Sequence, residues 1–276
     1  MNLLGIDFED WFHPELIQKV LTNEKRNPTV IQGIDKILDW LNNHETYATF
    51  FVVGELLKFQ PELFDKIIEN GHEIGFHTMY HTRLDTKGFK EKFENEIKTF
   101  DKITSGKSKG FRAPTFSLNY SSRWLIDILE QNNYQYDSSV VPAKTSLYGL
   151  PNAGVKPYKI SSNSLEHEDI NAKIMEFPIL VTKLFGKKIP AGGGFYVRTL
   201  PDKIVSNAIK KNEKNDIPAV FYIHSWELTP EYMPKIKLSL KDNFITYHNI
   251  EKTLSKMGKI LDEFPFTSFE RFLKNV

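Results

Sequence analysis

Two histidines four residues apart, His77 and His81, are well placed to bind a metal ion. Imidazole nitrogens are common ligands of divalent metals, and two of them can reach one ion if the chain turns helically between them. The pair follows an apolar segment, so we expect it at the end of a buried strand. The alternative is a pair of hydrogen-bonded loop histidines. Because the chain contains no cysteine, any metal must be held by histidine and carboxylate side chains.

Three carboxylates, Asp7, Glu9 and Asp10, end the first apolar run of the chain. Such a cluster repels itself unless a cation or a guanidinium neutralises it. Strand alternation places Asp7 and Glu9 on one side and Asp10 on the other, unless the strand ends between them. Trp11 and Phe12 follow directly, which favours partial burial over a solvated loop. One carboxylate and the two histidines would form a facial triad that leaves coordination positions for water and substrate.

Two further candidate residues stand at the ends of predicted strands. Arg112 stands between Phe111 and the turn at Pro114, which favours pairing with a buried acid over a surface position. His224 ends a β-type run that begins at Val220, and a histidine there can act as a general acid near neutral pH. A hydrogen-bonded core histidine is the alternative.

These residues lie at the carboxyl ends of strands that alternate with helices. The strands are predicted over 3–8, 47–53, 72–77, 109–112, 134–138, 174–180 and 219–224. The helices are predicted over 29–43, 61–70, 87–103, 122–132, 202–212, 248–263 and 268–273. Such alternation predicts parallel strands with helices outside, and in α/β barrels the carboxyl ends of the strands carry the active site. The turn-rich stretch 140–168 is predicted to cross the barrel mouth.

Composition narrows the class of protein. A net charge of +1, from 36 basic and 35 acidic side chains, creates no field that favours nucleic acid. No apolar run approaches the ~20 residues that a membrane span needs. The first residues lack the basic and apolar regions of a signal peptide, so we expect a cytoplasmic protein. With no internal repeat or clear boundary, residues 1–276 are predicted to form a single domain.

Taken together, the four segments resemble the motifs of the polysaccharide deacetylase family, which is carbohydrate esterase family four with its chitooligosaccharide-deacetylase homology domain. The resemblance covers roughly residues 1–230 and includes the strand Ala48–Val52. The four motif segments are Ile6–Asp10, His77–His81, Arg112–Phe116 and Ile223–His224. The resemblance implies a distorted (β/α) barrel of about seven parallel strands with a C-terminal helical extension.

The motifs depart from the family pattern at several positions. Glu9-Asp10 replaces the usual Asp-Asp pair, and Phe116 stands where the family has tyrosine. The nearest candidate for the fourth motif is Tyr136–Ser139. These departures resemble an exopolysaccharide-biosynthesis subgroup, whose C-terminal part would begin at about residue 230. Ala191–Tyr196 and His224–Leu228 also fit that subgroup.

The resemblance implies a metal-dependent hydrolase that removes N-acetyl groups from a carbohydrate. Asp10, His77 and His81 would hold a divalent metal, with Zn²⁺ favoured. Glu9 aligns with the base, and Asp7 is the alternative base or a ligand. Arg112 would keep the base ionised, and His224 would protonate the leaving amine. The substrate-binding candidates are Thr115, Phe116, Tyr196, Trp226 and Trp11.

Two other functions fit the same residues less well. One is an allantoinase-like cyclic amidase of the same fold, which the intact set Asp10, His77 and His81 disfavours. The other is a catalytically inactive carbohydrate-binding protein, which the intact base and acid disfavour.

Overall fold

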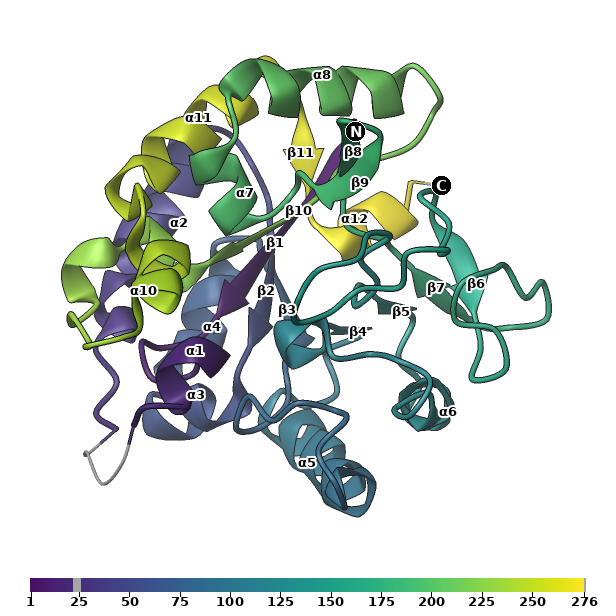
Figure 1. The fold of residues 1–276 in the computed structure, drawn as a ribbon. Coiled ribbons are helices and arrows are strands. Elements are labelled where there is room, and N and C mark those ends of the chain that lie inside the picture. Colours follow the sequence, from purple (N-terminus) through teal and green to yellow (C-terminus); the bar gives the residue numbers. More distant parts are fainter. Residues whose placement is uncertain (22–25, 276) are drawn as a thin grey trace.

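The main sheet follows the path β10-β1-β2-β3-β4-β5-β7-β6 in the computed structural model, which describes residues 1–21 and 26–275 (Figure 1). Every neighbouring pair from β10 to β7 is parallel, whereas β6 runs antiparallel to β7. The parallel strands curl into a half-barrel, which confirms the predicted fold class. The strands of the path are β1 (Asn2–Phe8), β2 (Thr49–Val52), β3 (Glu73–Phe76), β4 (Gly110–Phe111), β5 (Tyr136–Asp137), β6 (Tyr158–Ile160), β7 (Ile174–Glu176) and β10 (Val220–His224).

Helices cover the outside of this sheet (Figure 1). Those predicted in the first half of the chain occur with shifted ends: α2 (Ile34–Asn43) after the 3-10 turn η1 (Val30–Gly33), α4 (Glu62–Glu69), α5 (Phe89–Ile103) and α6 (Trp124–Gln131). The later predicted ones are α8 (Asp202–Glu213), α11 (Thr253–Glu263) and α12 (Phe269–Leu273). Over the described residues, no helix is both long and apolar enough to cross a bilayer.

Several short elements were not predicted. The helices among them are α1 (Glu15–Gln18), α3 (Gly54–Phe59), α7 (Gly194–Thr199), α9 (Ser225–Leu228) and α10 (Leu240–Tyr247). The strands are β6, which lies in the stretch predicted to be turn-rich, β8 (Val181–Leu184) and β9 (Lys187–Pro190), which form a hairpin, and β11 (Phe266–Thr267), which pairs with the start of β1. The short 3-10 turns are η2 (Pro114–Phe116), η3 (Pro230–Tyr232) and η4 (Ile250–Lys252).

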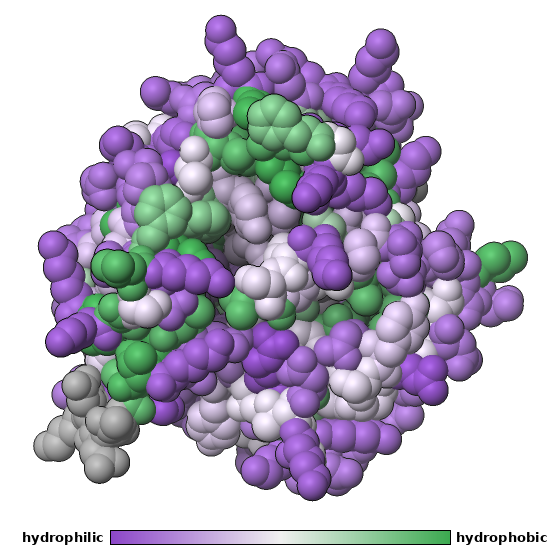
Figure 2. All heavy atoms as spheres, in the orientation of Figure 1, coloured by the Kyte–Doolittle hydropathy of each residue, from purple (hydrophilic) through white to green (hydrophobic). Residues whose placement is uncertain are grey.

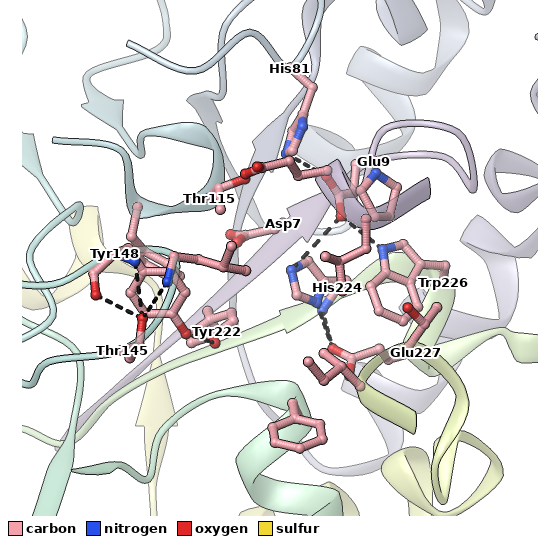
Figure 3. A pocket seen from close by; sticks show the side chains of 18 of the residues that line it. Asp7, Glu9, His81, Thr115, Thr145, Tyr148, Tyr222, His224, Trp226 and Glu227 are labelled. Atoms are coloured by element: carbon pink, nitrogen blue, oxygen red, sulfur yellow. Dashed lines mark hydrogen bonds and ion pairs between the residues drawn. The ribbon is translucent and has the colours of Figure 1, made fainter. Parts of the chain in front are cut away.

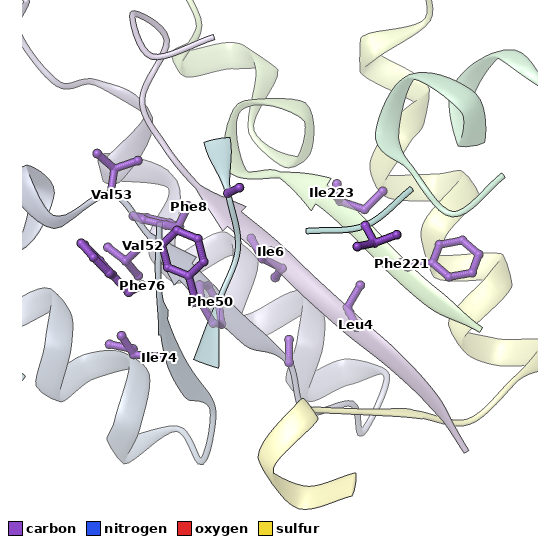
Figure 4. Packing of buried hydrophobic residues seen from close by; sticks show 14 of the residues in the cluster. Leu4, Ile6, Phe8, Phe50, Val52, Val53, Ile74, Phe76, Phe221 and Ile223 are labelled. Atoms are coloured by element: carbon purple, nitrogen blue, oxygen red, sulfur yellow. The ribbon is translucent and has the colours of Figure 1, made fainter. Parts of the chain in front are cut away.

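Alternation along β1 divides its side chains between two environments. Leu4, Ile6 and Phe8 pack outward with apolar residues of β2, β3 and β10 in the largest hydrophobic cluster (Figure 4). Leu3 belongs to a second cluster inside the barrel, and Asp7 lies on that same side. An apolar strand buried on both faces is typical of a parallel sheet.

The C-terminal helix α12 closes the barrel at the amino ends of the strands. Phe269, which is fully buried, stacks on Tyr136 with ring centres 5.2 Å apart. Its backbone N–H donates to Thr49 Oγ1 at 3.0 Å, and the next N–H donates to Glu73 Oε2 at 2.9 Å. Because Thr49 and Glu73 begin β2 and β3, α12 leaves the carboxyl ends as the open side of the barrel.

Candidate active site

The carboxylate of Asp7 lies inside the barrel against Arg112. The Arg112 guanidinium donates from Nη1 to Asp7 Oδ1 at 2.7 Å, and from Nε and Nη2 to the carbonyl and hydroxyl of Ser138. Both side chains are buried. A Cβ at Gly5 would lie 2.3 Å from Arg112 Nη1, so this glycine leaves the room that the guanidinium occupies. The predicted pairing of Arg112 with a buried acid is thus present, with Asp7 as the partner.

Glu9 reaches the same interior after β1 has ended. Its backbone N–H donates to Ser225 Oγ at 3.0 Å, which ties the strand end to α9. Its carboxylate Oε1 accepts from Trp226 Nε1 at 2.8 Å, and its Oε2 lies 2.6 Å from His81 Nε2. Burial alone would raise the pKa of Glu9, but the neighbouring His81, His224 and His77 hold it well below its usual range.

His77 and His81 converge on Glu9, with ligand atoms of the three residues all within 4.8 Å of one another. The segment between the two histidines bends without forming a helical turn. Thr78 and His81 adopt left-handed backbone angles (φ 57° and 53°). Such angles are costly for a β-branched residue and cluster at functional sites. The Thr78 hydroxyl supports the turn by accepting the N–H of Thr82 at 3.0 Å.

The ring orientation of His77 is fixed by the backbone. Its Nδ1 lies 2.7 Å from the Arg112 carbonyl and must donate to it, since a carbonyl oxygen can only accept. The other nitrogen, Nε2, is then the acceptor available to a metal. Burial lowers the pKa of His77 to about 4, which keeps the imidazole neutral as a metal ligand requires.

Asp10 lies outside this cluster, contrary to its predicted role as the metal carboxylate. Its Oδ1 accepts the N–H groups of Trp11 and Thr29, and its Oδ2 accepts that of Ile31. The side chain therefore binds the backbone around the start of η1. The physical reason is that β1 ends at Phe8, so strand alternation no longer sets the direction of the next two side chains. The Glu9 backbone is held by Ser225, and Asp10 faces the backbone N–H groups of the following segment.

His224 enters the site from the end of β10. Its Nδ1 lies 2.7 Å from Glu227 Oε2, its ring stacks on Trp226 at 4.8 Å, and its Nε2 lies 3.8 Å from Glu9 Oε1. Burial opposes protonation, but the Glu227 carboxylate, with Glu9 and Asp7 beyond it, raises the pKa of His224 to about 9. Figure 3 shows these residues facing one cavity.

The cavity has a volume of about 180 Å³ and opens in the hollowed face of Figure 2. Asp7, Glu9, His77, His81 and His224 line it, together with four of the predicted substrate-binding residues, Thr115, Phe116, Tyr196 and Trp226.

Trp11, the fifth predicted substrate-binding residue, lies outside the cavity lining. It is buried in a separate apolar cluster with Trp226, and its Nε1 donates to the Asn27 carbonyl at 3.0 Å. Its ring is therefore part of the core.

Several cavity residues were not predicted from the sequence. Residues 145–148 line the cavity from the stretch expected to cross the barrel mouth, and within them the Tyr148 hydroxyl lies 3.2 Å from that of Tyr222. Glu227 and Arg198 form a buried ion pair at 2.8 Å beside His224. The position of Glu227 three residues after His224 was the available signal, because that spacing permits a contact across one helical turn.

Two known sequence families match consecutive parts of the chain. Residues 29–136 match the family described as polysaccharide deacetylase, and residues 138–274 match a domain of unknown function (DUF3473). A solved structure from Mycobacterium smegmatis, described as a candidate polysaccharide deacetylase, shares the fold at a TM-score of 0.59 and 15% identity, covering 100% of this chain and 90% of that one.

Two relatives are more similar in sequence over shorter stretches. A peptidoglycan-N-acetylmuramic acid deacetylase of Bacillus subtilis is 44% identical over 52 residues, which are 19% of this chain and 20% of the relative. A peptidoglycan-N-acetylglucosamine deacetylase of Listeria monocytogenes is 24% identical over 181 residues, or 59% of this chain and 38% of the relative. The chain thus spans well under half the length of either relative.

Proposed function

Because residues 29–136 match the polysaccharide deacetylase family, we propose that the chain is a metal-dependent hydrolase that removes N-acetyl groups from a carbohydrate. The observation that carries the proposal is the convergence of Glu9, His77 and His81 beside the Asp7–Arg112 pair, with His224 lining the same cavity. Amide hydrolysis needs an activated water, a base and an acid for the leaving amine, and these groups supply all three.

The residues present fit a divalent cation. Glu9 Oε2 is buried and has no hydrogen-bond partner in the described part of the chain, although His81 Nε2 lies only 2.6 Å away. A cation bound by both atoms would satisfy each of them. Two imidazoles and one carboxylate suit Zn²⁺, which we propose as the metal. Bound there, the cation would polarise the acetamide carbonyl and lower the pKa of a water molecule.

We propose Glu9 as the carboxylate ligand in place of Asp10, and Asp7 as the base in place of Glu9. The Asp10 oxygens already accept three backbone N–H groups, whereas Glu9 lies with the two histidines. Asp7 lines the cavity and is paired with Arg112, so its carboxylate is held in place and oriented to accept the proton of the attacking water.

His224 is proposed to protonate the leaving amine. Amine nitrogen is a poor leaving group until it gains a proton, so a protonated imidazole facing the cavity completes the cleavage of the C–N bond. Thr115, at φ 52° on the cavity wall, is the proposed source of a backbone N–H for the oxyanion. The Phe116 N–H instead donates to the Ala113 carbonyl at 2.9 Å.

The names of the two relatives support an N-acetylated sugar polymer as the substrate. We propose a biosynthetic intermediate of an exopolysaccharide as the alternative, from the subgroup that the sequence motifs resemble. Tyr196 is the proposed ring for stacking on a sugar face, because Trp226 already stacks on His224.

We also propose that both family matches form one catalytic domain, with a subgroup-specific part from about residue 230. Asp7 precedes the first match, His77 lies in it, and His224 lies in the second, yet all three line one cavity. Strand β10 of the second match also pairs directly with β1.

Acetate release from N-acetylated oligosaccharides, with and without a chelator, tests the proposed function. The zinc-loaded protein should release acetate, and His77→Ala should lose both stoichiometric metal and activity. His167→Ala, which changes an exposed histidine, is the matched control and should keep both. Hydrolysis of cyclic amides without acetate release would favour the cyclic amidase instead. Sugar binding without any turnover would favour an inactive carbohydrate-binding protein.

A further inference from the structure

The glycine-rich segment before α7 packs against the carboxylate that holds His224. A Cβ placed on Gly194 would lie 1.8 Å from Glu227 Oε2. No side chain fits at that distance, so the close approach of α7 to Glu227 depends on glycine at this position. The segment Ala191–Tyr196 therefore has a structural role next to His224, the proposed acid.

Arg198 follows Gly194 by four residues, which places it one turn along on the same face of α7. Its Nε donates to Glu227 Oε1 at 2.8 Å, and both side chains are almost fully buried. The remaining guanidinium N–H groups donate to the backbone carbonyls of Ile245, Thr246 and His248. Arg198 thereby connects Glu227 to the end of α10.

Glu227 in turn fixes the imidazole of His224. Its Oε2 accepts from His224 Nδ1 at 2.7 Å and from the His224 backbone N–H at 3.1 Å. Because an ionised carboxylate can only accept hydrogen bonds, Nδ1 must carry the proton. Nε2 is then the ring nitrogen that can exchange a proton with a substrate.

We propose that Arg198 and Glu227 are positioning residues for His224. Arg198 holds the Glu227 carboxylate in place, and Glu227 sets the direction of the imidazole that protonates the leaving amine. Ile245 and Thr246, whose carbonyls bind Arg198, also line the cavity. The Arg198 guanidinium therefore connects two parts of the cavity. One part is the wall formed by the end of α10, and the other is His224, which Arg198 reaches through Glu227. This inference rests on the proposed deacetylase function.

The test compares two substrates that differ in their need for an acid. An N-acetylated oligosaccharide releases an amine that must be protonated, whereas an aryl acetate releases a phenolate that needs no proton. Glu227→Gln and Glu227→Asp should lower kcat on the oligosaccharide by about 100-fold, with KM, metal content and aryl acetate turnover changed little. Glu227→Asp retains the charge but withdraws the carboxylate, so it covers the case in which Glu227→Gln does not fold.

A double-mutant cycle with His224→Ala adds a second readout. If Glu227 acts through His224, Glu227→Gln should cause no further loss of oligosaccharide turnover once the imidazole is gone. Equal losses on both substrates, or full additivity in the cycle, would show that the positioning role is wrong. The matched control is Glu73→Gln, which alters a buried carboxylate at the opposite end of the strands and should not separate the two substrates.

A spectroscopic measurement separates this inference from the proposed function. The His224 Nδ1–H that donates to Glu227 should give a far-downfield proton resonance, absent in His224→Ala and Glu227→Gln. If that resonance is present while the wild-type protein releases no acetate, the deacetylase function fails and the positioning contact stands. If acetate is released but neither resonance nor substrate selectivity depends on Glu227, only the positioning role fails.

Discussion

Glu9 and Asp10 are adjacent carboxylates with different surroundings. Glu9 lies with His77 and His81, and one of its oxygens has no hydrogen-bond partner among the described residues. Asp10 is surrounded by backbone N–H groups that use both of its oxygens. Substitution of each by its amide should therefore have different effects.

Glu9→Gln is expected to abolish stoichiometric zinc binding while the protein remains folded, because the amide keeps the oxygen that accepts from Trp226 but lacks the charge. Asp10→Asn should keep the metal but lose about 1–3 kcal/mol of stability, since an amide cannot accept all three backbone N–H groups. Metal analysis and urea unfolding of both variants measure the difference. Retention of zinc by Glu9→Gln and its loss from Asp10→Asn would restore the assignment made from the sequence.

Asp7→Asn should keep zinc and lower turnover by about 10²–10⁴-fold, which is the usual effect of removing a general base. Stability should also fall, by up to about 3–5 kcal/mol, because Arg112 loses the charge of its buried partner. Kinetics are therefore measured below the melting temperature, beside Asp127→Asn as a control at an exposed carboxylate. Near-normal turnover by Asp7→Asn would return the base role to Glu9.

At the residue scale, the sequence identifies residues that the structure brings together in the candidate site, but not the role of each one. The types and spacing of Asp7, His77, His81 and His224 predict a hydrolytic metal site, and all four line the cavity. Aligning adjacent acids with a motif could not decide between Glu9 and Asp10, because their roles depend on where β1 ends and which way the next residue turns.

At the scale of elements, two neighbouring strands bring a pair of acids together inside the barrel. Asp137 of β5 is the direct register partner of Glu176 of β7, and both are fully buried. Burial raises the pKa of Asp137 to about 6, and burial together with the Asp137 charge raises the pKa of Glu176 well above its usual value. Asp137 Oδ2 and Glu176 Oε2 have no hydrogen-bond partner among the described residues, and a proton shared between the two carboxylates would satisfy both oxygens.

This pair should make folding stability depend on pH. Both groups bind protons more tightly in the folded than in the unfolded chain, so their contribution is fully present at about pH 4 and is lost as pH rises through 6 and above. Glu176→Gln supplies a permanent proton donor, so its stability relative to the wild type should increase between pH 5 and pH 8. Urea unfolding at several pH values measures this, with Glu62→Gln as the exposed control. A difference that does not change with pH would argue against the shared proton.

The elements that sequence patterns missed are short or lack a clear apolar stripe. Leu240 and Phe244 of α10 are exposed at 94% and 47%, so this helix shows little of the periodicity that marks a packed face. The β8–β9 hairpin turns at Phe185 and Gly186, both with positive φ, and a large aromatic residue is an unusual occupant of such a turn. The parallel strands were found because each is an apolar run bounded by polar or turn residues.

At the scale of the whole molecule, we expect stability to depend on α12, the helix that closes the barrel at the amino ends of the strands. Phe269→Ala removes a fully buried ring that contacts Tyr136, Phe51 and Phe177, and should cost about 3–5 kcal/mol. Phe185→Ala makes the same change at a side chain that is 95% exposed and should cost less than about 0.5 kcal/mol. Equal unfolding midpoints for the two variants would mean that α12 does not contribute to the stability of the barrel.

The pairing of β1 with β10 also has a consequence for the order in which the molecule can fold. Asp7 and His224 are register partners, and Glu9 is tied to Ser225, which lies 216 residues later. At a synthesis rate of 5–20 residues per second, β1 leaves the ribosome about 10–40 s before β10 exists to cover its second edge. An apolar strand with an open edge can pair with other chains during that interval. The same long-range pairing that assembles the proposed catalytic groups therefore delays their assembly and leaves an apolar strand edge exposed during synthesis.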